Sequence, residues 1–100
     1  MQVVLDAIAS PRRREILRAV WDRELTAGQI AAGSDVSWPA VSQNLNVLRS
    51  AGLVTERREG TRRYYRAEPS ALGPFQAALQ QMWEDDLDRL KEAVEHSQRA

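Results

Sequence analysis

Apolar residues recur at helical spacing near the start of the chain and predict two helices there. A short helix is expected within residues 1–9, where one side is formed by Val3, Val4, Ala7 and Ile8. Ser10 and Pro11 begin a second helix that runs to about Asp22, because serine is a good N-cap and proline is tolerated in a first turn. The apolar stripe of this second helix consists of Ile16, Leu17, Val20 and Trp21. Its solvent side is expected to carry Arg12, Arg13, Arg14 and Arg18.

Residues 26–52 have the pattern of two helices separated by a tight turn. Thr26 and Gln29 have the spacing of a capping box, in which a hydroxyl and an amide satisfy each other's backbone donors. This spacing predicts a short helix that ends at about Ala32, followed by a turn at residues 33–35. A second helix after that turn would complete a helix-turn-helix.

The second helix of this pair is predicted from Ser37 onward. Serine is a suitable N-cap, and Pro39 lies in the first turn, where proline costs no hydrogen bond. The positions expected in the core are Val41, Leu45 and Leu48. Gly52 is placed to end the helix in the left-handed conformation, with Leu53 packing back behind it.

A short hairpin and a long helix are expected in the rest of the chain. The hairpin covers residues 53–67, and Gly60 supplies the positive φ that its turn needs. Residues 70–74 fit either a first helical turn or a loose lead-in, and the last helix runs from about Phe75 to Ser97. Its apolar stripe consists of Phe75, Leu79, Met82, Trp83, Leu87, Leu90 and Val94.

Together these elements predict one winged helix-turn-helix domain over residues 1–100. The fold class is mainly α with a small β-hairpin wing, comprising about five helices and a two-stranded antiparallel hairpin. Within it, residues 26–52 form the helix-turn-helix and residues 53–67 the wing. A domain of this size buries only about 60–65% of its surface on folding, so additional core from a partner subunit is expected.

Charge is unevenly distributed along a chain whose net charge is zero. Residues 1–66 hold eleven basic and seven acidic residues, a net of +4, whereas residues 67–100 hold three and seven, a net of −4. All but one of the basic residues are arginines, which suit bidentate contacts to phosphates and bases. The neutral total therefore still permits a basic, nucleic-acid-binding face.

Other sequence features narrow the possible classes of protein. The chain has no cysteine, which excludes disulfides, thiolate metal ligands and thiol redox switches. It shows neither an apolar run of membrane-spanning length nor a signal peptide, so the expected location is the cytoplasm. No nucleophile–base pair or phosphate-cradling loop supports an enzyme.

Helix-turn-helix geometry predicts which side chains face DNA, because the second helix lies in the major groove with its N-terminal residues near the bases. Gln43 can bond adenine bidentately, and arginines at the wing tip can enter a minor groove or hold phosphates. The residues expected to bind DNA are Ser37, Trp38, Pro39, Ala40, Ser42, Gln43, Asn46, Arg58, Thr61, Arg62 and Arg63. Three alternatives to these DNA contacts remain open. Trp38 could pack on a neighbouring helix, and the polar side of the second helix could simply face solvent. The wing arginines could pair with Glu56 and Glu59.

Several stretches resemble the ArsR/SmtB family of bacterial repressors in order and spacing. They are SPRRREIL (10–17), ELT (24–26), SWPAVSQNLNVLR (37–49), AGLV (51–54) and REGTRRYY (58–65). The resemblance implies a homodimeric repressor that binds an inverted-repeat operator in double-stranded DNA. It also implies dimerisation through the terminal helices, within residues 1–9 and 70–97. The residues expected at this interface are Val4, Ile8, Phe75, Leu79, Met82, Trp83, Leu87, Leu90 and Val94.

The chain departs from the family pattern at two places. Asn44 and Asn46 stand where many members have histidine and lysine, which removes an expected phosphate contact. Ser34 and Asp35 replace the usual apolar residue and glycine of the turn, so the turn is expected to differ slightly.

The sensor site of metal-responsive members is not recognisable in this sequence. Leu25-Thr26-Ala27-Gly28 has no cysteine pair, and the last helix offers acidic residues but only one histidine, His96. A transition-metal site wants several imidazole or thiolate ligands. The resemblance therefore implies a metal-independent member, and no metal or other cofactor is expected. A metal-responsive repressor using the acidic residues and His96, and a winged helix that binds proteins, remain the alternatives; the sequence identifies no small-molecule effector.

Overall fold

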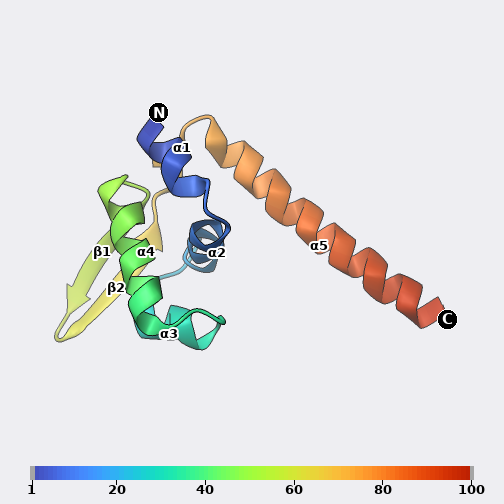
Figure 1. Cartoon of the computed structure of the whole chain (residues 1–100), viewed down its shortest axis with the longest axis horizontal. Coiled ribbons are helices and arrows are strands. Elements are labelled where there is room, and N and C mark those ends of the chain that lie inside the picture. Colours follow the sequence, from blue (N-terminus) through green and yellow to red (C-terminus); the bar gives the residue numbers. More distant parts are fainter. Residues whose placement is uncertain (1, 100) are drawn as a thin grey trace.

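The computed structural model describes residues 2–99, and these fold into five α-helices, a 3-10 helix and one β-hairpin (Figure 1). In chain order the elements are α1 (Gln2–Ile8), α2 (Pro11–Ala19), α3 (Ala27–Ala32), α4 (Trp38–Ser50), β1 (Val54–Glu59), β2 (Arg62–Ala67), η1 (Pro69–Leu72) and α5 (Phe75–Arg99). The predicted fold class, mainly helical with a two-stranded antiparallel wing, is confirmed.

The helix starts have the capping bonds that the sequence predicts. The Ser10 hydroxyl accepts a bond from the Arg13 amide at 3.3 Å. Both bonds of the capping box form between Thr26 and Gln29, at 2.8 and 3.1 Å. At the other end of the helix-turn-helix, Gly52 adopts φ 78° and lets the chain reverse after α4. Local sequence therefore sets the boundaries of α3 and α4.

Helix α2 ends at Ala19, three residues earlier than the sequence pattern indicates. The carbonyl of Val20 accepts a hydrogen bond from the Ala67 amide at 2.8 Å, so this backbone group pairs with the hairpin. Leu25 then forms an isolated antiparallel bridge with Tyr65. A long-range pairing with β2 has thus replaced the last helical turn of α2.

Residues 70–74, which the sequence leaves ambiguous, lie in the short 3-10 helix η1 (Pro69–Leu72) and the turn after it. Gly73 ends η1 with φ 55°, a left-handed conformation that glycine adopts without strain. This turn directs the chain into α5.

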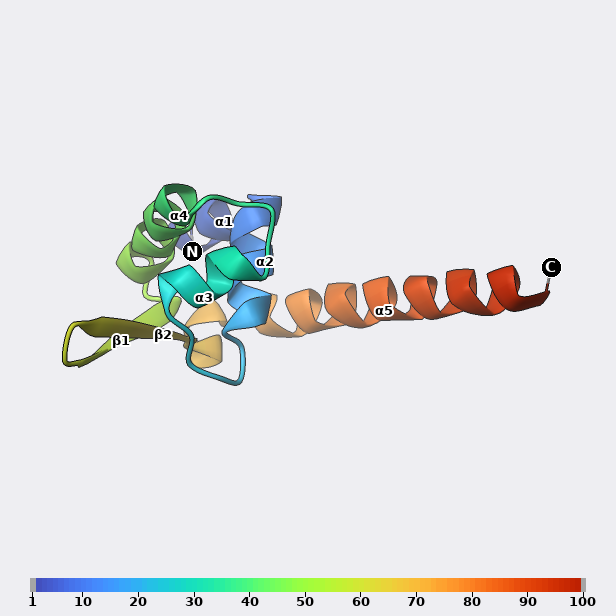
Figure 2. The ribbon, with the colours of Figure 1, turned by 90° about the horizontal axis from the view of Figure 1, so that it is seen from below.

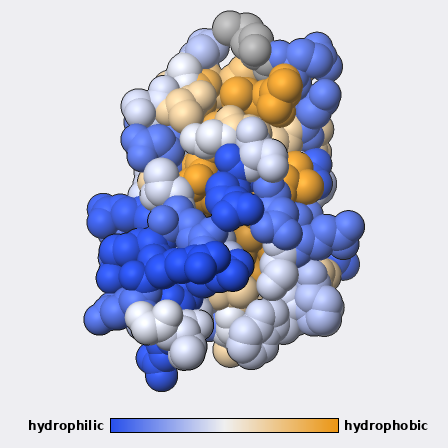
Figure 3. Space-filling model, turned by 90° about the vertical axis from the view of Figure 1, so that its left-hand side faces the viewer, coloured by the Kyte–Doolittle hydropathy of each residue, from blue (hydrophilic) through white to orange (hydrophobic). Residues whose placement is uncertain are grey.

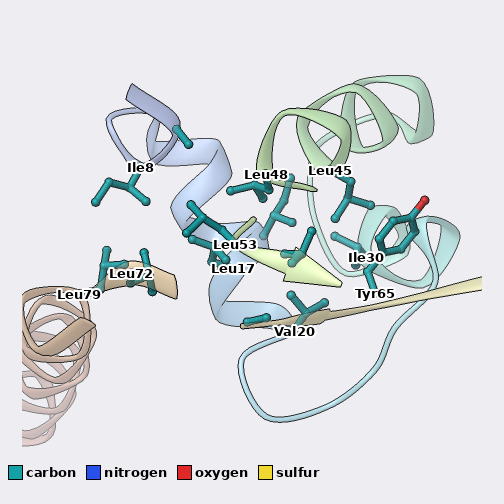
Figure 4. Packing of buried hydrophobic residues seen from close by; sticks show 14 of the residues in the cluster. Ile8, Leu17, Val20, Ile30, Leu45, Leu48, Leu53, Tyr65, Leu72 and Leu79 are labelled. Atoms are coloured by element: carbon teal, nitrogen blue, oxygen red, sulfur yellow. The ribbon is translucent and has the colours of Figure 1, made fainter. Parts of the chain in front are cut away.

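The core lies between α2, α4, the hairpin and the beginning of α5 (Figure 4). Its fully buried large side chains are Leu17, Leu45, Leu48, Leu53, Leu72, Val20 and Val41. The predicted core positions of α4 are all among them, each 0% exposed. Packing of α4 on this core fixes which of its sides is left for other contacts.

Helix α5 extends well beyond the rest of the protomer (Figures 1 and 2). Leu79 is only 2% exposed, and Phe75 and Trp83 pack partly against the core. Beyond Trp83 the helix carries exposed apolar side chains at Leu87, Leu90 and Val94. No helix among residues 2–99 is both long and apolar enough to cross a membrane.

Candidate nucleic-acid interface

Helix α4 presents a polar side away from the core. Val41, Leu45 and Leu48 are buried, so the helical repeat places Pro39, Gln43 and Asn46 on the opposite side, and all three are exposed. The Ser37 hydroxyl caps the helix by accepting a bond from the Ala40 amide at 3.4 Å. Ala40 and Ser42 are half-buried at the flanks of this side. Pro39, Gln43 and Asn46 therefore share one exposed surface, and Ala40 and Ser42 lie beside it.

Trp38 contacts a neighbouring helix and still faces solvent. A Cβ atom added to Gly28 of α3 would lie 3.2 Å from two ring atoms of Trp38, so the indole lies directly on this glycine. The residue nevertheless remains 61% exposed. Contact with α3 therefore leaves much of the ring free.

An open groove of about 740 Å³ separates α3 and α4 from the wing. It is lined by Thr26, Ala27, Gly28, Gln29, Ala32, Trp38, Ser42, Thr61, Arg62, Arg63 and Tyr65. Thr61, Arg62 and Arg63, which the sequence assigns to DNA binding from the wing, thus share one concave surface with Trp38 and Ser42 of the helix. On the side of the molecule that carries α4 and the hairpin, strongly hydrophilic residues form a band across the middle and left of the view, and apolar residues gather above it (Figure 3).

Asn44 does not lie on the free polar side. Its amide donates to the Ala40 carbonyl at 2.9 Å, and its Oδ1 accepts a bond from Arg13 at 3.4 Å. This residue, which departs from the family pattern, serves to join α4 to α2.

The expectation that all four arginines of α2 lie in solvent is wrong for two of them. Arg13 donates to the carbonyls of Ala7 at 2.6 Å and Asp6 at 3.1 Å. Arg14 donates to the carbonyl of Ile8 at 2.8 Å. The last carbonyls of a helix have no partner within that helix, so these guanidinium groups cap the C-terminal end of α1. A basic residue shortly after a predicted helix end was the available signal.

The antiparallel register divides the wing into two faces. Val54 pairs with Ala67, Glu56 with Tyr65 and Arg58 with Arg63. Val54, Tyr65 and Ala67 are buried, so Glu56, Arg58 and Arg63 continue this inner face toward the tip. The outer face carries Arg57, whose guanidinium lies 4.8 Å from the centre of the Tyr64 ring.

Ion pairs occupy several of the wing arginines. Arg57 pairs with Glu24 at 2.8 Å and with Glu59 at 3.1 Å. Arg58, which the sequence assigns to DNA binding, contacts Glu56 at 3.4 Å because both lie on the inner face. Among the ion pairs of the described residues, Arg62 takes part in none. Of the wing arginines assigned to DNA, only Arg62 therefore lacks a carboxylate partner in the described part of the chain.

Glu56 is the carboxylate around which the inner face is organised. Its side chain is 10% exposed and pairs with Arg49 at the end of α4, with Arg58 and with Arg63. Burial acts to raise the pKa of Glu56, but hydrogen bonds from Arg58 and Arg49 and the charges of Arg49 and Arg63 outweigh burial and hold that pKa below its ordinary value. Glu56 is therefore ionised at neutral pH. The sequence indicates Glu56 as a partner for arginines of the wing, but it carries no signal for the contact with Arg49, which belongs to a different element.

The residues predicted for a dimer interface fall into two groups. Ile8 and Leu79 are buried in the protomer's own core, and Val4, Phe75 and Trp83 are half-buried. Trp83 makes an edge-to-face contact with Trp21, with ring centres 4.9 Å apart. The remaining four, Met82, Leu87, Leu90 and Val94, are 44–61% exposed. Only this second group is fully available to another chain.

The acidic residues of α5 are exposed and make few contacts. Arg89 pairs with Asp86 at 3.9 Å and not with Asp85, which accepts a bond from Gln81 at 3.0 Å. Within residues 2–99, no three histidine or acidic side chains are grouped closely enough to hold a metal ion.

Comparison with known proteins places the sequence among bacterial regulators. Residues 10–56 match the model of the family "Bacterial regulatory protein, arsR family". The chain is 40% identical over 77 residues to the HTH-type transcriptional regulator Rv2034 of Mycobacterium tuberculosis, covering 77% of this chain and 72% of that protein. It is 36% identical over 72 residues to the transcriptional repressor SdpR of Bacillus subtilis, covering 72% of this chain and 80% of SdpR.

Solved structures agree with this assignment. NolR from Sinorhizobium fredii superposes with a TM-score of 0.73 at 30% identity, over 82% of each chain. A homodimeric winged helix-turn-helix DNA-binding domain from Mycobacterium bovis superposes with a TM-score of 0.72 at 34% identity, over 84% of this chain and 78% of that one. By their names, Rv2034 and SdpR are transcriptional regulators and not enzymes. The chain therefore belongs to the ArsR family and is a DNA-binding transcriptional regulator with a winged helix-turn-helix fold.

Proposed function

We propose that two copies of this chain form a homodimer in the bacterial cytoplasm, bind an inverted-repeat operator and repress transcription by covering the promoter. The single observation that carries this proposal is the apolar stripe of α5. Leu79, Trp83, Leu87, Leu90 and Val94 fall on one side of the helix by the helical repeat. The protomer covers the first two of them and leaves the last three 49–61% exposed.

A second α5 is the occupant that this exposed stripe favours. A two-fold axis lets the same stripe on each subunit cover its counterpart, which is the usual arrangement of a homodimer. Met82 and Val4 would border this contact, whereas the buried Ile8 and Leu79 support it from within each subunit. The Mycobacterium bovis domain, whose fold is similar, is described as homodimeric.

In this proposal, residues 1–9 and 70–97 provide the dimer interface, residues 26–52 the helix-turn-helix and residues 53–67 the wing. Gln43, Asn46 and Pro39 face base edges, with Ser42 and Ala40 beside them. Ser37 and Trp38 lie at the helix start, close to sugars and phosphates. Arg58, Thr61, Arg62 and Arg63 approach the backbone or the minor groove from the wing. Two such units bind half-sites about one DNA turn apart.

Fluorescence anisotropy tests this proposal. The protein is titrated onto labelled DNA from upstream of its own gene and onto a scrambled control, over a salt series and with a chelator throughout. Selective, salt-sensitive binding is expected in chelator, because specific contacts add to a phosphate term that depends on salt. Equal binding of both DNAs would contradict operator recognition. Binding that appears only after metal is added would support a metal-responsive repressor instead.

Sedimentation tests the dimer separately. The free protein is expected to have twice the mass of one chain at micromolar concentration. A monomer that remains monomeric on DNA would contradict the two-fold arrangement, even if the DNA is bound selectively.

A further inference from the structure

An arginine cluster joins α4 to the wing, and the Glu56 carboxylate holds it together. Arg49 comes from the last turn of α4, Arg58 from β1 and Arg63 from β2. All three pair with Glu56, at distances of up to 3.5 Å. The cluster carries three positive charges against one negative charge.

The cluster lies on the side of the wing that faces α4. Glu56, Arg58 and Arg63 share the inner face of the hairpin with the buried Val54 and Tyr65. Arg63 also lines the groove shared with Trp38 and Ser42. A DNA strand bound between α4 and the wing would therefore pass close to the Arg63 guanidinium, and Arg49 and Arg58 pair with the same carboxylate as Arg63.

Exposure differs sharply between the carboxylate and its partners. The Glu56 side chain is 10% exposed, whereas those of Arg49, Arg58 and Arg63 are 51%, 67% and 54% exposed. Phosphates can thus reach the arginines but not the carboxylate. An arginine that binds a phosphate must either break its contact with Glu56 or divide its N–H donors between Glu56 and the phosphate.

We propose that Glu56 is a positioning residue that holds Arg49, Arg58 and Arg63 back from the DNA backbone and so limits the sequence-independent part of DNA affinity. This proposal rests on the proposed function, since it assumes DNA between α4 and the wing. Glu56 touches no base and leaves readout by Gln43 and Asn46 unchanged. Arg62, which has no carboxylate partner among the described ion pairs, supplies phosphate contact from the wing without this restraint.

The test is the variant Glu56→Gln, which keeps the shape of the side chain and removes its charge. Anisotropy titrations with upstream and scrambled DNA are repeated over the salt series. With Glu56 neutral, the arginines should gain about one further contact to a DNA phosphate. The slope of log affinity against log salt concentration should then become steeper by about 0.9, and binding should tighten about tenfold near 0.1 M salt. The gain is expected on both DNAs. An unchanged slope or weaker binding would overturn the proposal.

Glu59→Gln is the matched control. It removes the same charge from the same strand, but Glu59 lies on the outer face and pairs with Arg57, which Glu24 also holds at 2.8 Å. A smaller effect than that of Glu56→Gln is expected. Equal effects would show that only the net charge of the wing matters and would overturn the proposal.

A double-mutant cycle guards against a folding defect in Glu56→Gln. Arg63→Gln is measured in the original protein and in the Glu56→Gln background. If Glu56 restrains Arg63, removing Arg63 should cost more affinity once Glu56 is neutral; equal costs would overturn the restraint. If the original protein binds neither DNA, the proposed function is overturned together with this inference. Selective binding with an unaltered slope in Glu56→Gln would overturn this inference alone.

Discussion

The body, formed by α1–α4 and the wing, differs from α5 in the extent to which the protomer buries its apolar side chains. In the body, the core positions of α2 and α4 are buried within the protomer, and the exposed large apolar side chains are Val3, Leu5, Trp38 and Val47. In α5, the stripe is buried only as far as Trp83 and continues exposed to Val94. The body thus covers most of its apolar stripes within one chain, whereas α5 leaves the second half of its stripe for another surface. Exposed polar residues on α4 suit DNA, and exposed apolar residues on α5 suit protein.

Leu90→Glu should have the largest effect, because it places a charge on the exposed apolar stripe of α5 and should prevent dimerisation. Leu90 is 61% exposed in the protomer, so a charge there is tolerated until a partner covers it. Two-fold symmetry places the change twice in one interface, and each buried unpaired charge costs several kcal/mol. Sedimentation should show monomers with unchanged circular dichroism.

Gln81→Glu is the control for Leu90→Glu, because the helical repeat places Gln81 on the opposite side of α5. It should remain dimeric. A dimer that survives Leu90→Glu would mean that the exposed stripe is not the interface.

Leu45→Ala should break the body instead. Leu45 is 0% exposed and lies in the centre of the core, where a leucine-to-alanine change costs about 2–5 kcal/mol. The free energy of unfolding, measured by urea denaturation, should fall by this amount. If the loss is below about 1 kcal/mol, α4 is not anchored as the structure shows.

Gln43→Ala should separate the role of the α4 surface from that of the α5 surface, because it should change only the sequence specificity of DNA binding. Gln43 is exposed on α4, so stability and dimer mass should not change. A good bidentate contact to adenine discriminates by about 1–3 kcal/mol. The ratio of upstream to scrambled binding should fall accordingly in anisotropy titrations. An unaltered ratio would remove Gln43 from direct readout.

Acid should produce the smallest effect, a loss of the link between α4 and the wing. The pKa of Glu56 is lowered on folding, so its ion pairs contribute stability at neutral pH, and this contribution disappears as pH falls through the lowered pKa. Thermal unfolding between pH 7 and pH 3 should show a steeper loss for the original protein than for Glu56→Gln. Parallel curves would mean that Glu56 contributes nothing to stability.

Local sequence alone determined most of the helix boundaries and the fold class. Ser10, Thr26 and Ser37 cap helices by bonds to residues three positions later, and Gly52 reverses the chain by its own conformational freedom. The buried positions of α4 follow from the helical repeat. These features depend on neighbours in the chain, which is why they could be predicted without a structure.

The tertiary structure decided the features that join distant parts of the chain. Helix α2 ends early because Val20 pairs with Ala67, and Arg13 caps α1 while also contacting Asn44. Glu56 meets Arg49 only because α4 packs beside the hairpin. Periodicity tells which side of an element is buried, but a charge finds its partner only when folding brings separate elements together. The sequence therefore determined the framework that presents α4 and the wing, and the packing of distant segments determined which arginines are free for DNA.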